Sequence, residues 1–81
     1  MKIELSKSAV KDLKNIQDPH RKHIEKKIYD LLQFPEIPGI KKLTEHHPAY
    51  RLRVGNYRIL FDVEIDTIFV GRILHRKEAY R

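Results

Sequence analysis

The chain has no cysteine and no long run of apolar residues. Without cysteine it can form neither a disulfide framework nor a thiolate zinc site, and such a chain is easiest to place in a reducing cytoplasm. No segment approaches the roughly 20 apolar residues that cross a bilayer. Residues 1–13 also lack the continuous apolar stretch that begins a secretory signal. We therefore expect a cytoplasmic protein that is neither exported nor embedded in a membrane.

Internal repeats, low-complexity tracts and linkers are also missing. The 81 residues are therefore expected to form one domain, residues 1–81. A chain of this length buries roughly 60% of its unfolded surface when it folds. Hydrophobic residues make up 41% of the sequence and recur throughout it, which favours a globular domain over a disordered chain.

Acidic residues are few compared with basic ones. Seventeen Lys and Arg against eleven Asp and Glu give a net charge of +6 and a pI of about 9.7. This balance indicates a polyanionic partner or an acidic protein partner, and a solvated basic surface is the alternative. The positions of the basic residues must decide between them.

The spacing of apolar residues predicts a strand at 2–5 and then two helices. Ser6 or Ser8 can cap the first helix, whose apolar stripe is Ala9, Val10, Leu13 and Ile16. Asp18 and Pro19 predict the start of a second helix at about 19–33. Its apolar stripe is Ile24, Ile28, Leu31 and Leu32. The two helices are expected to form an antiparallel hairpin.

Beyond the prolines and glycine of residues 35–39 the period becomes that of strands. Strands are predicted at 50–54, 57–63 and 67 to about 75, with turns at Gly55-Asn56 and near 64–66. The fold class is therefore α+β: an N-terminal strand, a helical hairpin and a three-stranded antiparallel meander. The helices are expected to cover one face of the sheet.

Strand register predicts where the arginines lie. If Gly55-Asn56 is a two-residue loop, Arg53 opposes Arg58, and Arg51, Arg53 and Arg58 share the face that the helices leave uncovered. The opposite face then carries Tyr50, Leu52, Val54, Tyr57, Ile59, Phe61 and Val63. A three-residue loop at 64–66 would also align Arg72 with Arg58, whereas a two-residue loop would break that match.

Directly opposed like charges are unfavourable in a sheet, so the arginine row is more easily understood as a preformed anion site. Guanidinium groups suit phosphate because their planar forks bind it bidentately and stay charged. The alternative is a set of exposed arginines whose stems cover apolar neighbours.

The segments LRVGNYRILFDV (52–63) and VGRILHRKEAYR (70–81) resemble the RelE branch of the RelE/ParE toxins. The resemblance extends over essentially the whole chain, including the helical hairpin. It implies a toxin of a type II toxin–antitoxin system, an endoribonuclease that cuts messenger RNA in the A site of the 30S ribosomal subunit without a cofactor or metal. It also implies a cognate antitoxin with an acidic or amphipathic segment, bound in an oligomeric complex.

Metal-free RNA cleavage needs a base for the 2′-OH, positive charge on the phosphorane and an acid for the leaving oxygen. The resemblance implies that Arg58 stabilises the scissile phosphate with help from Arg53, and that Arg76 is a second catalytic arginine. It also implies that Tyr80 acts on the 2′-OH or stacks on a nucleobase. Histidine exchanges protons near neutral pH, which makes His75 a candidate acid or base. The catalytic set is thus Arg53, Arg58, His75, Arg76 and Tyr80, and the expected RNA-binding residues are Lys41, Lys42, Arg51, Arg72 and Arg81.

The sequence departs from the family pattern at the general base. Ala49 and Arg51 stand where well-studied members carry lysines on the first meander strand. Some members instead use histidines or a glutamate, so Glu45, His46 and His47 are further candidates or else solvated loop residues. His20 and His23 have helical spacing, but no matching carboxylate cluster completes a metal site, and no metal is expected.

Two other functions are compatible with this fold. One is a ParE-like toxin, which poisons DNA gyrase by binding and lacks the catalytic arginine and tyrosine set. The other is a catalytically inactive module that only binds an antitoxin.

Overall fold

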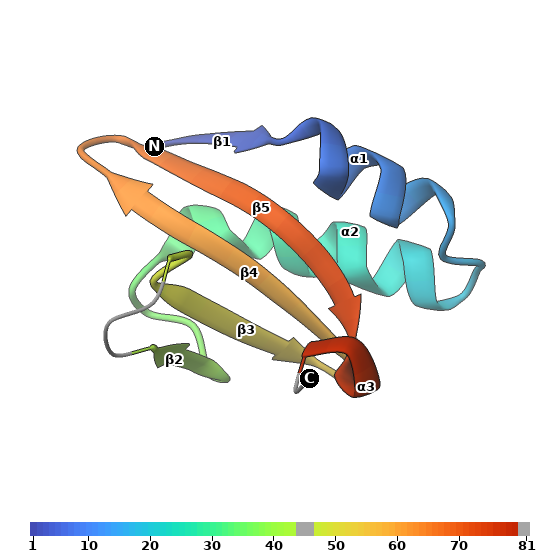
Figure 1. The fold of residues 1–81 in the computed structure, drawn as a ribbon. Coiled ribbons are helices and arrows are strands. Elements are labelled where there is room, and N and C mark those ends of the chain that lie inside the picture. Colours follow the sequence, from blue (N-terminus) through green and yellow to red (C-terminus); the bar gives the residue numbers. More distant parts are fainter. Residues whose placement is uncertain (44–46, 80–81) are drawn as a thin grey trace.

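The computed structural model describes residues 1–43 and 47–79 (Figure 1). In chain order its elements are β1 (Lys2–Leu5), α1 (Lys7–Lys14), α2 (His20–Asp30), the 3-10 helix η1 (Leu31–Gln33), β2 (Ile40–Lys42), β3 (Tyr50–Val54), β4 (Tyr57–Glu64), β5 (Thr67–His75) and α3 (Arg76–Ala79). In the described ranges, no helix has both the length and the apolar character needed to span a membrane.

The strands form one mixed sheet in the order β1-β5-β4-β3-β2. Its centre is the predicted antiparallel meander β3-β4-β5, which confirms the α+β fold class. Two additions were not predicted: β1 pairs parallel with β5, and the short β2 pairs antiparallel with β3. A parallel pair needs a long crossover. Here α1 and α2 supply part of that connection.

The first helix begins after Ser6, one of the two predicted caps, whose hydroxyl accepts a hydrogen bond from the Ala9 amide at 3.0 Å. The prediction for the second helix was less accurate. Pro19 occupies the N-cap position of α2 without a side-chain hydrogen bond, and the Asp18 carboxylate instead lies 3.8 Å from Arg21. The helical segment changes to 3-10 geometry at Leu31, so α2 and η1 together cover residues 20–33.

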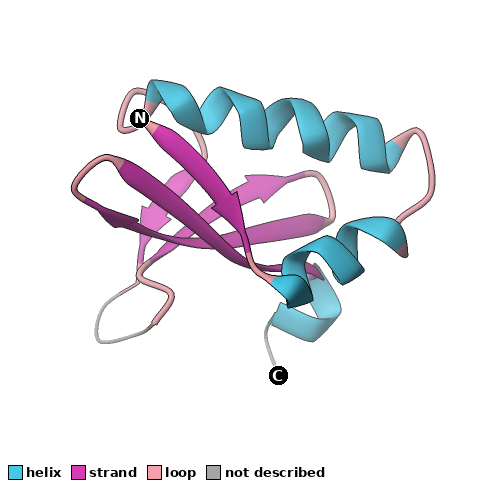
Figure 2. Cartoon of the chain, turned by 90° about the horizontal axis from the view of Figure 1, so that it is seen from above, coloured by secondary structure: helices cyan, strands magenta, loops and turns pink. Residues whose placement is uncertain are grey.

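Figure 2 shows α2 on one side of the sheet and α3 on the other. Apolar residues of α1, α2 and η1 pack with those of the strands to form the core, whose fully buried members include Ile24, Leu31, Leu52, Ile59, Phe61, Ile68 and Val70. Val10, predicted to be buried, is 39% exposed. The helix α1 lies against β1 and β5 at the side of the sheet.

The register of β3 and β4 is the predicted one, with Arg53 opposite Arg58. The β4–β5 loop, however, contains only Ile65 and Asp66, because Glu64 pairs with Thr67. Ile65 adopts φ 49°, a left-handed conformation rare for a β-branched residue, which explains why sequence alone did not favour the two-residue loop over the three-residue one.

A bulge then shifts β5 by one residue at Gly71. As a result Arg72 pairs with Leu60 and Arg58 with Leu74. Of the two predicted alternatives, the structure has the two-residue loop, and Arg72 is not aligned with Arg58.

Candidate nucleic-acid interface

The side of the sheet that α1 and α2 leave uncovered carries most of the predicted site, and we call it the open face. Strand register places two rows of residues on it. One row runs Lys41, Arg51, Leu60 and Arg72, and the other runs Arg53, Arg58 and Leu74. Lys42 pairs with Tyr50 and so belongs to the opposite side of the sheet. Of the two lysines of β2, only Lys41 shares the open face with the arginines.

These cations differ in how far they reach solvent. Lys41 and Arg53 are exposed and Arg51 is half-buried. Arg58, by contrast, is only 3% exposed. Its Nη1 donates hydrogen bonds to the carbonyl oxygens of Gly55 at 3.0 Å and Tyr57 at 2.8 Å. Arg58 thus lies in the predicted row opposite Arg53, but it is buried and supplies a charge beneath the surface beside the exposed Arg53.

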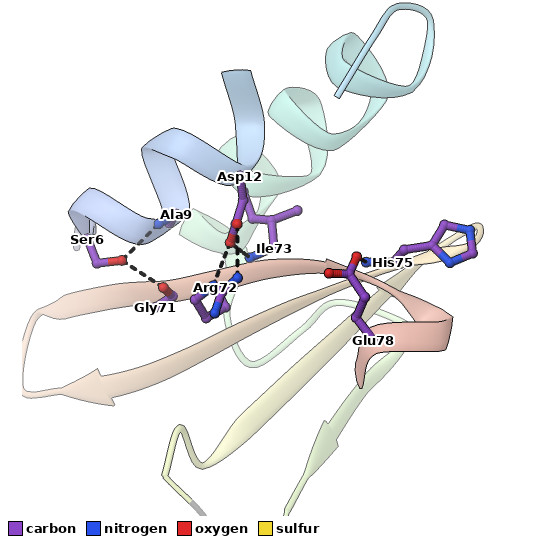
Figure 3. Close-up of polar contacts among 8 residues, drawn as sticks. All are labelled: Ser6, Ala9, Asp12, Gly71, Arg72, Ile73, His75 and Glu78. Carbon is purple, nitrogen blue, oxygen red and sulfur yellow. Dashed lines mark hydrogen bonds and ion pairs between the residues drawn. The ribbon is translucent and has the colours of Figure 1, made fainter. Parts of the chain in front are cut away.

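Arg72 is held by a carboxylate of α1. Its Nε and Nη2 donate to the two oxygens of Asp12 at 2.8 and 3.1 Å, as Figure 3 shows. The hydrogen bonding of the Arg72 guanidinium to the Asp12 carboxylate raises the pKa of Arg72 above its ordinary value. The charge of Arg72 is thus largely balanced within the protein, which weakens the expectation that it binds RNA.

Partial burial by itself raises the pKa of Asp12. The hydrogen bonds from Arg72 and from the Ile73 amide outweigh this effect, so the pKa lies below its ordinary value. The Ile73 amide donates to Asp12 at 2.9 Å. The carboxylate therefore stays charged at neutral pH and joins α1 to β5.

Asp12 and Ser6 together satisfy the edge of β5 beyond the end of β1. The Ser6 amide donates to the Val70 carbonyl at 2.9 Å and its hydroxyl to the Gly71 carbonyl at 2.7 Å (Figure 3). Asp12 accepts the next amide, that of Ile73. Ser6, the N-cap of α1, and the Asp12 side chain thus replace a partner strand along the stretch of β5 that leads to the C-terminal segment.

We expect Asp12→Asn to lower the free energy of unfolding by about 1–3 kcal/mol at neutral pH, since it removes the charged acceptor of Arg72. The folded pKa of Asp12 is depressed, so its stabilisation is complete above the ordinary carboxyl pKa of about 3.9 and is lost as pH falls through the folded value. Urea unfolding at neutral pH and at about pH 3 measures both effects.

The matched control is Asp18→Asn, because Asp18 is 43% exposed and lies 3.8 Å from its partner Arg21. This control is expected to cost under about 0.5 kcal/mol. An Asp12→Asn deficit that stays as large at about pH 3 as at neutral pH would contradict the assignment.

The segment before β3 crosses the open face. The Ala49 amide donates to Asp62 Oδ1 at 2.6 Å, and Pro48 lies over Gly71. His47 Nδ1 lies 3.9 Å from the same Asp62 oxygen, and its side chain is 93% exposed. His47 is therefore the described member of the loop candidates that lies on the open face, whereas Glu45 and His46 fall outside the described residues.

The predicted C-terminal cluster is only partly brought together. Arg76 begins α3 and is exposed, and its amide donates to the Asn56 carbonyl of the β3–β4 turn at 2.6 Å. His75 pairs with Tyr57, and their rings meet edge to face at 5.4 Å on the helix-covered side. It therefore does not share a side with the arginines. Tyr80 and Arg81 lie outside the described residues.

Sequence reasoning missed Asp12, although a signal for it was present. Asp12 lies three residues after the buried Ala9 and so falls on the same side of the helix. It also lies in the last turn of α1, where a negative charge is unfavourable to the helix dipole. An acidic residue in such a place indicates a cationic partner on a neighbouring element.

Three comparisons place this geometry among known proteins. The family model described as the ParE toxin of type II toxin–antitoxin systems, parDE, matches residues 3–80. Toxin RelE3 of Methanocaldococcus jannaschii is 42% identical over 84 residues, covering 99% of this chain and 96% of that protein. A putative toxin RelE1 of the same organism is 31% identical and covers 98% of this chain and 93% of that protein.

Solved structures share the fold. The RelB–RelE antitoxin–toxin complex from Methanococcus jannaschii contains a chain that matches with a TM-score of 0.76 and 40% identity, covering 94% of this chain and 93% of that one. The isolated RelE toxin of E. coli matches with a TM-score of 0.73 at 22% identity and covers 96% of this chain and 93% of that one. At that identity the second likeness concerns the fold alone.

Proposed function

The chain belongs to the ParE toxin family of type II toxin–antitoxin systems and is a RelE-like toxin, and on this premise we propose that it is an endoribonuclease that cleaves messenger RNA in the ribosomal A site. The observation that carries the proposal is the open face, where Lys41, Arg51 and Arg53 reach solvent beside the buried charge of Arg58. A polyphosphate chain is the partner that such a surface favours.

The arginines have different parts in the proposed reaction. Arg53 is exposed and can contact a phosphate directly through its planar fork. Arg58 lies opposite it, and its fixed, poorly solvated charge favours the extra negative charge of the phosphorane. Arg76, exposed at the start of α3, adds a third cation from the C-terminal segment, which continues to Tyr80.

Three residues are candidates for the proton transfers of the reaction: Arg51, His47 and Tyr80. Arg51 lies on the open face but is a poor base, because its guanidinium stays protonated. The exposed imidazole of His47, near Asp62 on the same side, is a better base by its chemistry. Tyr80 is the other proposed group on the 2′-OH. His75 is left out of the catalytic set because its ring lies against Tyr57 on the other side of the sheet.

We further propose that a cognate antitoxin with an acidic or amphipathic segment neutralises the chain. The net charge of +6 supports an acidic partner. The match to a toxin chain solved as a RelB–RelE complex supports a protein partner of the antitoxin type. Binding over the open face would exclude RNA from the arginines.

The family model that matches is named for ParE, so gyrase poisoning is the second candidate. A binding-only module is the third. Neither function needs a transition-state charge such as that of the buried Arg58 opposite Arg53, which is why we favour the ribonuclease.

The deciding experiment is primer extension on messenger RNA bound to programmed ribosomes, with and without the antitoxin-free protein. We expect new 3′ ends within the A-site codon. A gyrase supercoiling assay runs in parallel. Absence of cleavage by folded protein, together with gyrase inhibition, would move the function to the ParE type. Absence of both effects would leave the binding-only module.

A further inference from the structure

The helix α3 is short, and its described side chains are not buried against the rest of the protein. It has four residues, Arg76–Ala79, and the side chains of Arg76, Lys77 and Glu78 are all exposed. A single helical turn is not stable by itself in water. Its position therefore depends on the hydrogen bonds at its start.

One of these hydrogen bonds joins the Arg76 amide to the Asn56 carbonyl of the β3–β4 turn at 2.6 Å, and two more form a reciprocal cap around His75. The Lys77 amide donates to His75 Nδ1 at 3.3 Å, and the His75 amide donates to Glu78 Oε1 at 3.4 Å. Figure 3 shows His75 and Glu78 on either side of this first turn. The pattern is that of a capping box, with histidine in the place usually taken by serine or threonine and glutamate three residues later.

We propose that His75 is a positioning residue, whose neutral imidazole caps α3 and fixes Arg76 beside the open face, and whose protonation releases that turn. The cap is a property of the fold. Its consequence for cleavage rests on the proposed function.

The chemistry of the ring sets the direction of the effect. Nδ1 accepts a hydrogen bond only when it carries no proton, so the observed contact requires the proton on Nε2. A doubly protonated imidazole has no acceptor left for the Lys77 amide. Its positive charge would also face the amide groups of a helix start, where a cation is unfavourable.

Charged groups of both signs lie near the ring. Glu78 and Asp12 line the same pocket of about 220 Å³, and Asp12 is already paired with Arg72. Arg76 and Lys77 are the cations of α3 next to His75 in the chain. On the covered side the ring contacts Tyr57, whose other neighbour is His20 of α2. The remaining pocket residues are Asn15, Ile16 and Ile73.

The first experiment follows the cap without using activity. Cα chemical shifts of residues 76–79 report the helicity of α3, and we compare about pH 7.5 with about pH 5.5, a range in which histidines commonly titrate. In the wild type the shifts are expected to be helical at the higher pH and to lose at least about half of that helicity at the lower pH.

Two substitutions of the same residue separate the cap from the charge. In His75→Asn the side chain keeps an acceptor suited to a helix start but does not titrate, so α3 is expected to stay helical at both pH values. In His75→Ala the turn is expected to be lost at both. Helical shifts that persist in His75→Ala, or a pH response that persists in His75→Asn, would overturn the cap.

The second experiment measures cleavage at about pH 7.5. His75→Asn is expected to stay within about threefold of the wild type, whereas His75→Ala falls by at least about tenfold, because Arg76 is misplaced. Loss of cleavage in His75→Asn while α3 stays helical would overturn the positioning role and make His75 a group that acts on RNA. If the wild type itself cleaves nothing, the proposed function fails, and the chemical shifts still decide the cap.

Discussion

Arg58→Ala is expected to lower cleavage of ribosome-bound messenger RNA by at least about 100-fold, the effect of removing one preorganised charge from a transition state. Arg58 is 3% exposed and lies opposite Arg53. Its charge is therefore fixed in place before RNA arrives. Single-turnover primer extension with ribosomes in excess measures the rate.

Two further variants make this result specific. Arg58→Lys keeps a positive charge but loses the guanidinium whose Nη1 donates to the carbonyls of Gly55 and Tyr57, so only part of the rate is expected to return. Arg21→Ala removes the same charge from α2, where Arg21 is paired with Asp18, and is expected to cleave like the wild type. Equal losses in Arg21→Ala and Arg58→Ala would show that overall charge, not this site, governs cleavage.

Arg58→Ala also removes a donor from two carbonyl groups, so its stability must be measured beside its activity. We expect a cost of about 1–2 kcal/mol in the free energy of unfolding. A loss of this size leaves most molecules folded, since a domain of 81 residues is stable by roughly 4–12 kcal/mol. The 100-fold loss of rate would then result from the missing transition-state charge and not from unfolding.

Phe61→Ala is expected to lower the free energy of unfolding by about 3–5 kcal/mol, the second large effect. The Phe61 side chain is fully buried at the centre of the sheet. Its ring stacks on Tyr50 at 5.4 Å and meets Phe34 edge to face at 6.0 Å. Removing it leaves a cavity between β3, β4 and the end of the helical segment, which urea unfolding monitored by circular dichroism would detect.

Phe69→Ala is the matched control, because Phe69 is an aromatic residue of the neighbouring strand β5 that is 36% exposed. Its cost is expected to be under about 1.5 kcal/mol. Equal costs for the two variants would contradict the core described above. In cells, Phe61→Ala and Arg58→Ala should both lose toxicity, but only Phe61→Ala should also lower the amount of folded protein.

Local patterns in the sequence were sufficient for most of the fold. Period-2 alternation and the Gly55-Asn56 turn predicted β3 and β4 with their register, and that register placed Arg53 opposite Arg58. These features depend on neighbours only a few residues apart, so the sequence contains the information directly. The same patterns, together with the C-terminal HRKEAY segment, pointed to the RelE/ParE family, to which the chain belongs.

The errors in the site come from contacts between distant segments. The tight turn at Ile65 and the bulge at Gly71 changed the partner of Arg72, and neither has a strong local signal. Asp12 lies 60 residues before Arg72 in the chain, so the ion pair between them could not be predicted from residue spacing.

The sequence by itself determined most of the elements, the meander, the basic character and the family of this protein, because each depends on local periodicity, composition or a short motif, whereas β2 and α3 were not predicted. Only the tertiary structure decided which cations reach solvent. Arg53 stays exposed, Arg58 is buried beneath the open face and Arg72 is paired with Asp12. The physical reason is that burial and charge pairing depend on how helix, turn and strand ends meet in space, and the same residue type has a different role in each setting.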